Sequence, residues 1–198
     1  MSVELSVDDI SDLRAYERER AAFRAHVIEM KKKRRIHLGP LLTLLAENRE
    51  TVRFQIQEMA RVEKITTDAG IETELRTYNP LISRPGKLSA TMFVELTNSE
   101  LVREWLPRLV GIEQAIELHL GVGDTAEIIL NRVDRSHDDA LTRQDTTSTV
   151  HYVWWPVTAE QVEKFVAGPT RIVCAHAAYR ESTELTEQNR IEIGGDLR

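Results

Sequence analysis

The sequence predicts an α+β fold in which a long N-terminal helix and a second helix pack on a mainly antiparallel sheet. Apolar residues recur at the helical period in the first third of the chain, and strand-like alternation dominates the remainder. Two of the predicted strands are joined by the tight turn at residues 121–125, which is typical of an antiparallel hairpin. Strands and helices alternate too irregularly for a doubly wound parallel sheet.

The composition limits the classes of protein to which this chain can belong. The 198 residues suffice for a sizeable core, and we predict one domain over residues 1–198. A hydrophobic fraction of 41% and a charged fraction of 29% exclude a disordered chain and an integral membrane protein. The N-terminus lacks the features of a signal peptide. The one cysteine, Cys174, excludes an intramolecular disulfide, and we expect a cytoplasmic protein with no membrane partner.

Residues 7–35 are predicted to form one long helix. Ser6, with Asp9 three residues later, is typical of a capping box. Apolar side chains recur on one face at close to the helical period, namely Ile10, Leu13, Tyr16, Phe23, Val27 and Met30. Arg20 occupies a position on this apolar face, where a guanidinium needs a carboxylate or a bound anion. A structural ion pair is the simpler interpretation, and an anion site is the alternative.

The charge of the chain is unevenly distributed. Residues 14–35 carry a net charge of +6, so the remainder of this chain of net charge −6 carries −12. The simpler interpretation is a solvated helix face whose C-terminal cations suit the helix dipole. The functional alternative is a surface that docks on an acidic partner, with candidate residues Lys31, Lys32, Lys33, Arg34 and Arg35. The acidic remainder argues against nucleic-acid binding.

The first half of the chain continues with shorter elements. Gly39-Pro40 is expected to end the first helix, and residues 41–46 to form a short strand or turn. Residues 49–67 suit a second helix, with an uncertain start. Residues 70–88 contain Gly70 and two Pro-containing turns, so we predict a turn-rich connection there.

The second half is predicted to be mostly sheet. Strands are expected at 88–96, 116–122, 126–133, 150–157 and 170–176, and helices at 99–110, 158–167 and after Glu181. Residues 134–149 are polar with little to bury, which predicts a long loop. The adjacent Trp154 and Trp155 suit a core or a homo-oligomer interface equally well.

Two histidines stand at strand ends. Alternation places His151 on one face with Val153 and Trp155, whereas His176 closes the last strand and Tyr179 follows it. Such imidazoles could ligate a transition metal or a haem, or act as acid and base. Their spacing is not diagnostic, so independently hydrogen-bonded histidines are the simpler interpretation. No P-loop, nucleophile elbow, HExxH or CxxC motif accompanies them.

Several blocks of the sequence resemble an uncharacterised bacterial family known only as a domain of unknown function. In chain order these blocks are DLRAYERERAAFRAHVIEMKKKRRIHLGP, LLAENRETVRFQIQEMARVEKI, YNPL, SATM, VHY and HAAY. The resemblance covers nearly the whole chain. Members of the family are often encoded beside a rubrerythrin-like di-iron protein and an iron–sulphur protein similar to a heterodisulfide-reductase subunit. The resemblance therefore implies a role near peroxide defence or thiol redox chemistry, with one of these proteins as a partner.

Together these observations predict a polar pocket between the helices and the sheet. Its candidate residues are Arg20, Glu47, Arg49, Glu58, Arg61, His151, His176 and Tyr179. The expected ligand is a metal or a small anion, in a protein accessory to redox or oxidative-stress metabolism. One alternative is a non-catalytic module that docks its basic helix on an acidic redox partner. The other is a small-molecule enzyme with a histidine as general acid or base.

Overall fold

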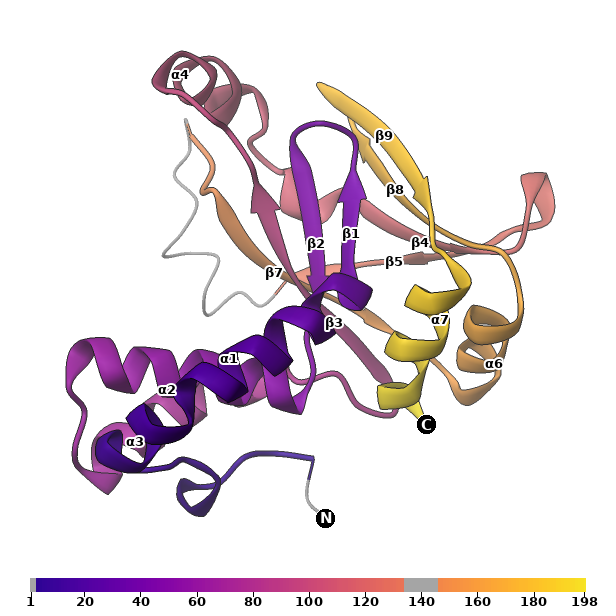
Figure 1. The fold of residues 1–198 in the computed structure, drawn as a ribbon. Helices are drawn as coiled ribbons and strands as arrows, with labels where there is room; N and C mark the ends of the chain where they lie inside the picture. The colour runs from indigo at the N-terminus through magenta and orange to yellow at the C-terminus, as the bar shows by residue number, and fades with distance from the viewer. Residues whose placement is uncertain (1–2, 134–145) are drawn as a thin grey trace.

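The computed structural model describes residues 3–133 and 146–198, and it confirms the α+β fold (Figure 1). A five-stranded sheet has the order β1-β2-β3-β7-β6, and a four-stranded sheet has the order β5-β4-β8-β9. The strands are β1 (Arg35–Leu38), β2 (Leu42–Ala46), β3 (Lys87–Val94), β4 (Ile116–Leu120), β5 (Glu127–Leu130), β6 (Arg132–Val133), β7 (Val150–Pro156), β8 (Thr170–His176) and β9 (Tyr179–Glu184). Every strand pairing is antiparallel among the described residues.

Most of the described helices form two groups. They are α1 (Leu13–Arg34), α2 (Arg49–Glu63), α3 (Asp68–Tyr78), α4 (Ser99–Arg108), α6 (Ala159–Ala167) and α7 (Glu187–Gly194). Figure 1 shows α1, α2 and α3 together at one side of the molecule, and α6 with α7 at the other. In the described parts of the chain, no helix is both long enough and apolar enough to cross a bilayer.

Two apolar clusters hold these layers together. The larger one lies between the two sheets and includes Leu44, Met92 and Trp155. The smaller one lies under α2 and α3 and includes Val52 and Ile56, with Tyr152 packed against it. The five-stranded sheet therefore has one face on the second sheet and the other face toward the helices. Its alternating side chains contribute to both clusters.

The first helix is shorter than the sequence predicts. Ser6 and Asp9 do form a capping box, but they cap a single 3₁₀ turn at Val7–Asp9. The helix proper starts at Leu13, where the Asp12 carboxylate accepts hydrogen bonds from two backbone N–H groups. At its other end α1 passes directly into β1. Gly39-Pro40 therefore turns a hairpin rather than ending the helix.

Besides β1, two elements are absent from the sequence prediction. The expected connection at residues 70–88 contains α3, which Thr67 caps and which tolerates Gly70 in its first turn. The tail from Glu181 is predicted to end in a short helix, which α7 confirms, but β9 precedes this helix and is an edge strand with alternating exposure. Of the polar loop predicted at residues 134–149, positions 134–145 lie outside the described residues.

The two adjacent tryptophans face opposite sides of β7. Trp155 is 1% exposed and belongs to the core between the sheets. Trp154 lies on the other face, where Lys87 Nζ and the Arg132 guanidinium lie 5.1 and 5.2 Å from its ring centroid. One of the pair is therefore core, and the other is a half-buried surface residue.

The β1–β2 hairpin depends on Gly39, and Gly39→Ala is expected to destabilise the protein. Gly39 has φ +65°, and an added Cβ would overlap the hydroxyl of Tyr179 and the side chain of Glu181. That hydroxyl donates to the carbonyl of Leu38 at 2.8 Å and accepts from the Leu41 N–H at 3.0 Å. We expect a loss of about 2–3 kcal/mol in the free energy of unfolding, measured by urea denaturation.

Gly86→Ala is the matched control. Gly86 also has a positive φ, +86°, but nothing lies within 4 Å of an added Cβ. In this variant the free energy of unfolding should fall by only about 1 kcal/mol, the cost of placing alanine at a positive φ. Equal losses in the two variants would show that the contact with Tyr179 contributes nothing.

Candidate functional site

A cavity of about 240 Å³ lies between α2, α3 and the outer face of the five-stranded sheet. Its polar and aromatic lining consists of Glu47, Gln55, Tyr78, Thr91, Phe93 and Tyr152, and three aliphatic side chains complete it. The cavity occupies the place where the sequence predicts a polar pocket, between the helices and the sheet. Of the eight predicted pocket residues, Glu47 is the one that lines it.

Strand pairing sets the floor of this pocket. In the register of β3 and β7, Thr91 lies opposite Tyr152 and Phe93 lies opposite Val150. Because successive side chains on a strand point to opposite faces, all four lie on the face turned toward the helices. Their neighbours Met92 and Val153 are buried on the other face, between the two sheets.

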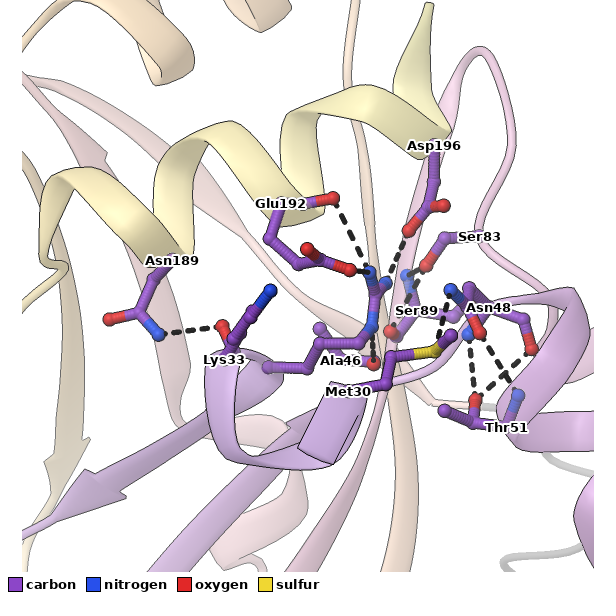
Figure 2. Close-up of polar contacts among 11 residues, drawn as sticks. Met30, Lys33, Ala46, Asn48, Thr51, Ser83, Ser89, Asn189, Glu192 and Asp196 are labelled. Carbon is purple, nitrogen blue, oxygen red and sulfur yellow. Dashed lines mark hydrogen bonds and ion pairs between the residues drawn. The ribbon is translucent and has the colours of Figure 1, made fainter. Parts of the chain in front are cut away.

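Hydrogen bonds of both its N–H and its carbonyl group hold the backbone of Glu47 in place. Its N–H donates to the Ser89 carbonyl at 2.9 Å, and its own carbonyl accepts from the Ser83 N–H at 3.4 Å. On the next residue, Asn48 forms a capping box with Thr51 at the start of α2 (Figure 2). These contacts fix the point at which β2 ends and α2 begins. The Glu47 side chain is thereby placed at the pocket before any ligand arrives.

The Glu47 residue is nearly fully buried, and among the described residues one side chain donates a hydrogen bond to its carboxylate. The residue is 7% exposed, and its Oε1 accepts a hydrogen bond of 2.6 Å from the Thr91 hydroxyl. Within residues 3–133 and 146–198 no lysine, arginine or histidine forms an ion pair with it. An ionised carboxylate offers about four acceptor positions, so most of its capacity is unused by the chain.

The two phenols of the pocket are held protonated. Burial raises the pKa of Tyr152, and the nearby Tyr78 and Glu47 raise it further. Burial also raises the pKa of Tyr78, although a hydrogen bond from Gln55 acts in the opposite direction. At neutral pH both rings therefore present neutral hydroxyl groups beside a buried carboxylate.

Three other predicted residues form a separate cluster between α1 and α2. Arg20 donates two hydrogen bonds to Glu58, with Nε to Oε1 at 2.7 Å and Nη2 to Oε2 at 2.9 Å. Tyr16 donates to the same carboxylate at 2.8 Å, and Arg61 lies 3.5 Å from it. The ion-pair interpretation of Arg20 is confirmed. Its hydrogen bonds, with that of Tyr16, lower the pKa of Glu58 to about 2.

The remaining predicted residues have separate partners. Arg49 pairs with Asp9 at 2.6 Å, and Tyr179 holds the β1–β2 hairpin. His151 lies on the core-facing side of β7, away from the pocket, with Nε2 at 2.9 Å from the Thr147 hydroxyl. His176 belongs to the other sheet, and its Nε2 lies 3.1 Å from the Val110 carbonyl.

The described chain gathers no metal-ligand cluster. In residues 3–133 and 146–198 no group of three or more histidine, cysteine, aspartate or glutamate side chains could hold a metal ion. The two histidines proposed as ligands lie in different sheets and bond to different groups.

The predicted docking surface at the end of α1 is smaller than the sequence suggests. Arg34 is fully buried, and its guanidinium bonds to the Ala46 carbonyl and pairs with Asp196 and Glu192 near the C-terminus. Figure 2 labels these two acidic residues, Glu192 on α7 and Asp196 in the 3₁₀ turn that follows it. Lys31 lies over the ring of Phe54, 5.5 Å from its centroid. The exposed cations are Lys32, Lys33 and Arg35.

Most of the pocket lining is missing from the sequence prediction. Tyr78 belongs to α3, which the sequence does not predict, and Tyr152 lies on a predicted strand but is not among the predicted pocket residues. The available signal was alternation, which places Thr91 and Phe93 opposite the core-facing side chains of the same strand.

Comparisons with known proteins identify one similar structure and one family. A structure of a protein of unknown function from Burkholderia pseudomallei superposes with a TM-score of 0.88 at 32% sequence identity, covering 98% of this chain and 99% of that chain. No curated protein matches the sequence. The family described as "Protein of unknown function (DUF3501)" matches residues 4–197. The chain belongs to the DUF3501 family.

Proposed function

We propose that this protein binds a small organic molecule in the pocket between α2, α3 and the five-stranded sheet. The observation that carries the proposal is the buried Glu47 side chain, which lines a cavity of about 240 Å³. Ligand sites are typically concave and mostly apolar, with a few polar groups that converge from different elements. Here these groups come from the end of β2, from α2, from α3 and from β3 and β7.

The size of the cavity limits the ligand. A volume of about 240 Å³ corresponds to about eight water molecules, at about 30 Å³ each in the liquid. A ligand of about ten non-hydrogen atoms would fill it. Gln55 is exposed and lies at the rim, so a longer molecule would leave the pocket beside this side chain.

The geometry supports a neutral or cationic ligand better than the metal or anion expected from the sequence. Among the residues that the structure describes, the lining contains one carboxylate and no basic side chain. An anion would meet the charge of Glu47 without a counter-charge, and a transition metal prefers more than one strong ligand. Histidine acid–base chemistry has no support at this site, because His151 faces the other side of its sheet.

Docking on an acidic redox partner, such as a rubrerythrin-like or iron–sulphur protein, has weaker support than the pocket. With Arg34 buried and Lys31 over Phe54, the basic end of α1 presents Lys32, Lys33 and Arg35. Exposed charges of this kind contribute to encounter rates more than to affinity. We therefore place the function in the pocket.

The test is a panel of small organic molecules of about ten non-hydrogen atoms or fewer, including cations, neutral molecules and anions. Binding is followed in ¹H–¹⁵N spectra of the protein. We expect at least one probe to shift the signals of Glu47, Thr91 and Tyr152. Native mass spectrometry of freshly purified protein provides a second readout, a bound small molecule of natural origin.

Gln55→Trp should close the rim of the pocket. The exposed position tolerates a large side chain, so the fold is expected to survive while probe affinity falls at least tenfold. Gln188→Trp, at an exposed position of α7, is the control and should leave binding unchanged. Probes that bind equally to both variants would show that the site lies elsewhere.

A further inference from the structure

We infer that the ligand of this pocket is a small organic cation, such as a primary amine, and that Glu47 is its anchor. This inference rests on the proposed function and adds the charge of the ligand to it. It follows from two features of the lining: a buried carboxylate without a counter-ion, and aromatic rings around it.

The first feature is an incomplete charge balance. Glu47 is 7% exposed and receives one side-chain hydrogen bond, from Thr91. Burying an ionised carboxylate without a basic partner is costly, and proteins normally pair such charges. Two other carboxylates of the described chain have such a partner, since Arg34 contacts Asp196 and Arg20 contacts Glu58. At Glu47 the described chain leaves the position of the cation open, on the side of the cavity.

The second feature is the aromatic lining. Phe93, Tyr78 and Tyr152 line the same cavity as Glu47. Aromatic ring faces attract cations, and the attraction is larger where water is excluded. Within residues 3–133 and 146–198, no lysine or arginine lines the cavity.

Hydrogen-bonding capacity favours an ammonium group in particular. A primary ammonium has three N–H donors and no acceptor. The Glu47 carboxylate has free acceptor positions, and the Thr91 oxygen can accept even while its proton is donated to Glu47. A neutral alcohol would satisfy fewer of these acceptors and would leave the carboxylate charge uncompensated.

Three probes of matched shape and different charge test the inference: n-butylamine, 1-butanol and butyrate. Each is titrated into the intact protein, and its dissociation constant is measured from the shifts of pocket signals. We expect butylamine, protonated at pH 7, to bind at least tenfold tighter than butanol, and butyrate to bind weakest. Glu47→Gln should reduce the affinity for butylamine at least tenfold and leave that for butanol unchanged. Glu72→Gln, which removes an exposed acid on α3, should change neither.

A stability measurement without ligand supports the binding test. Glu47→Gln keeps the shape of the side chain and an acceptor for Thr91, and it removes a buried charge. Its melting temperature should equal or exceed that of the wild type. A clear fall would show that the charge already has a partner in the fold, and it would overturn the inference.

The outcomes separate the inference from the proposed function. If butanol or butyrate binds the pocket as tightly as butylamine, the inference fails and the proposed function stands. If none of these probes and no molecule of the wider panel shifts the pocket signals, both fail. A preference for butylamine that persists in Glu47→Gln would show that a group other than Glu47 provides the anchor.

Discussion

Arg34→Ala is expected to lower the free energy of unfolding by about 3–5 kcal/mol, as is typical when one member of a buried ion pair is removed. The Arg34 side chain is 0% exposed, and it joins the end of α1 to three other parts of the chain. Its Nε donates to the Ala46 carbonyl at 2.8 Å, and its Nη atoms reach Glu192 and Asp196. Alanine would leave the carbonyl without its donor and Asp196 without its counter-ion.

Urea denaturation at pH 7 measures this loss, with Lys33→Ala as the control. Lys33 is exposed and its backbone carbonyl, not its side chain, bonds to Asn189, so its removal should change stability by less than about 0.5 kcal/mol. Similar losses in the two variants would contradict a structural role for the Arg34 pair.

The loss in Arg34→Ala should also depend on pH. Burial raises the pKa of Asp196 above its ordinary value, and Arg34 opposes this effect. Without the guanidinium the folded carboxyl would hold its proton to higher pH than the unfolded one. A carboxyl whose pKa is higher in the folded than in the unfolded state stabilises the fold at low pH, and this contribution is lost as the pH rises. The variant should therefore be destabilised less, relative to wild type, at pH 4 than at pH 7.

Glu58→Gln is expected to cost about 2 kcal/mol at pH 7, because Glu58 accepts from both Arg20 and the buried Tyr16. The hydrogen bonds from Arg20, followed by that from Tyr16, lower the pKa of Glu58 from 4.5 to about 2. A carboxyl with a lowered pKa stabilises the fold above the unfolded value and loses that contribution as the pH falls. The stabilities of wild type and variant should therefore converge between pH 4.5 and pH 2.

Glu17→Gln is the matched control for this pair of helices. Glu17 is about half exposed and lies 3.8 Å from Arg61, so its removal should have little effect at any pH. A constant difference between Glu58→Gln and wild type across the acidic range would show that the charge of Glu58 contributes nothing.

The elements that the sequence predicts well are those with a strong local period. The alternation at residues 88–96 and 150–157 corresponds to β3 and β7, and the pattern at 49–67 corresponds to α2. β1 is missed because its basic residues continue the composition of α1, and the change from helix to strand follows from pairing with β2. β9 is missed because an edge strand need not be apolar.

The site is harder to predict because it is assembled by tertiary contacts. Glu47, Tyr78 and Tyr152 are far apart in the sequence, and no local spacing relates them. Arg20 was recognisable because a cation interrupts an apolar helix face, which requires a partner whatever the fold. A buried Glu47 carboxylate needs a partner in the same way. Its burial, however, depends on the packing of α2 and α3 over the sheet, which the sequence does not reveal.

The pairing of Arg34 with Asp196 also sets an order of events during biosynthesis. The two residues are separated by 162 positions. At about 5–20 residues per second, a ribosome delivers Asp196 about 8–30 s after Arg34. During that interval the nascent chain can form α1 and the β1–β2 hairpin, and the guanidinium can donate to the Ala46 carbonyl, but it lacks the carboxylates of Glu192 and Asp196. The packing around Arg34 is therefore completed late, after α7 has emerged from the ribosome.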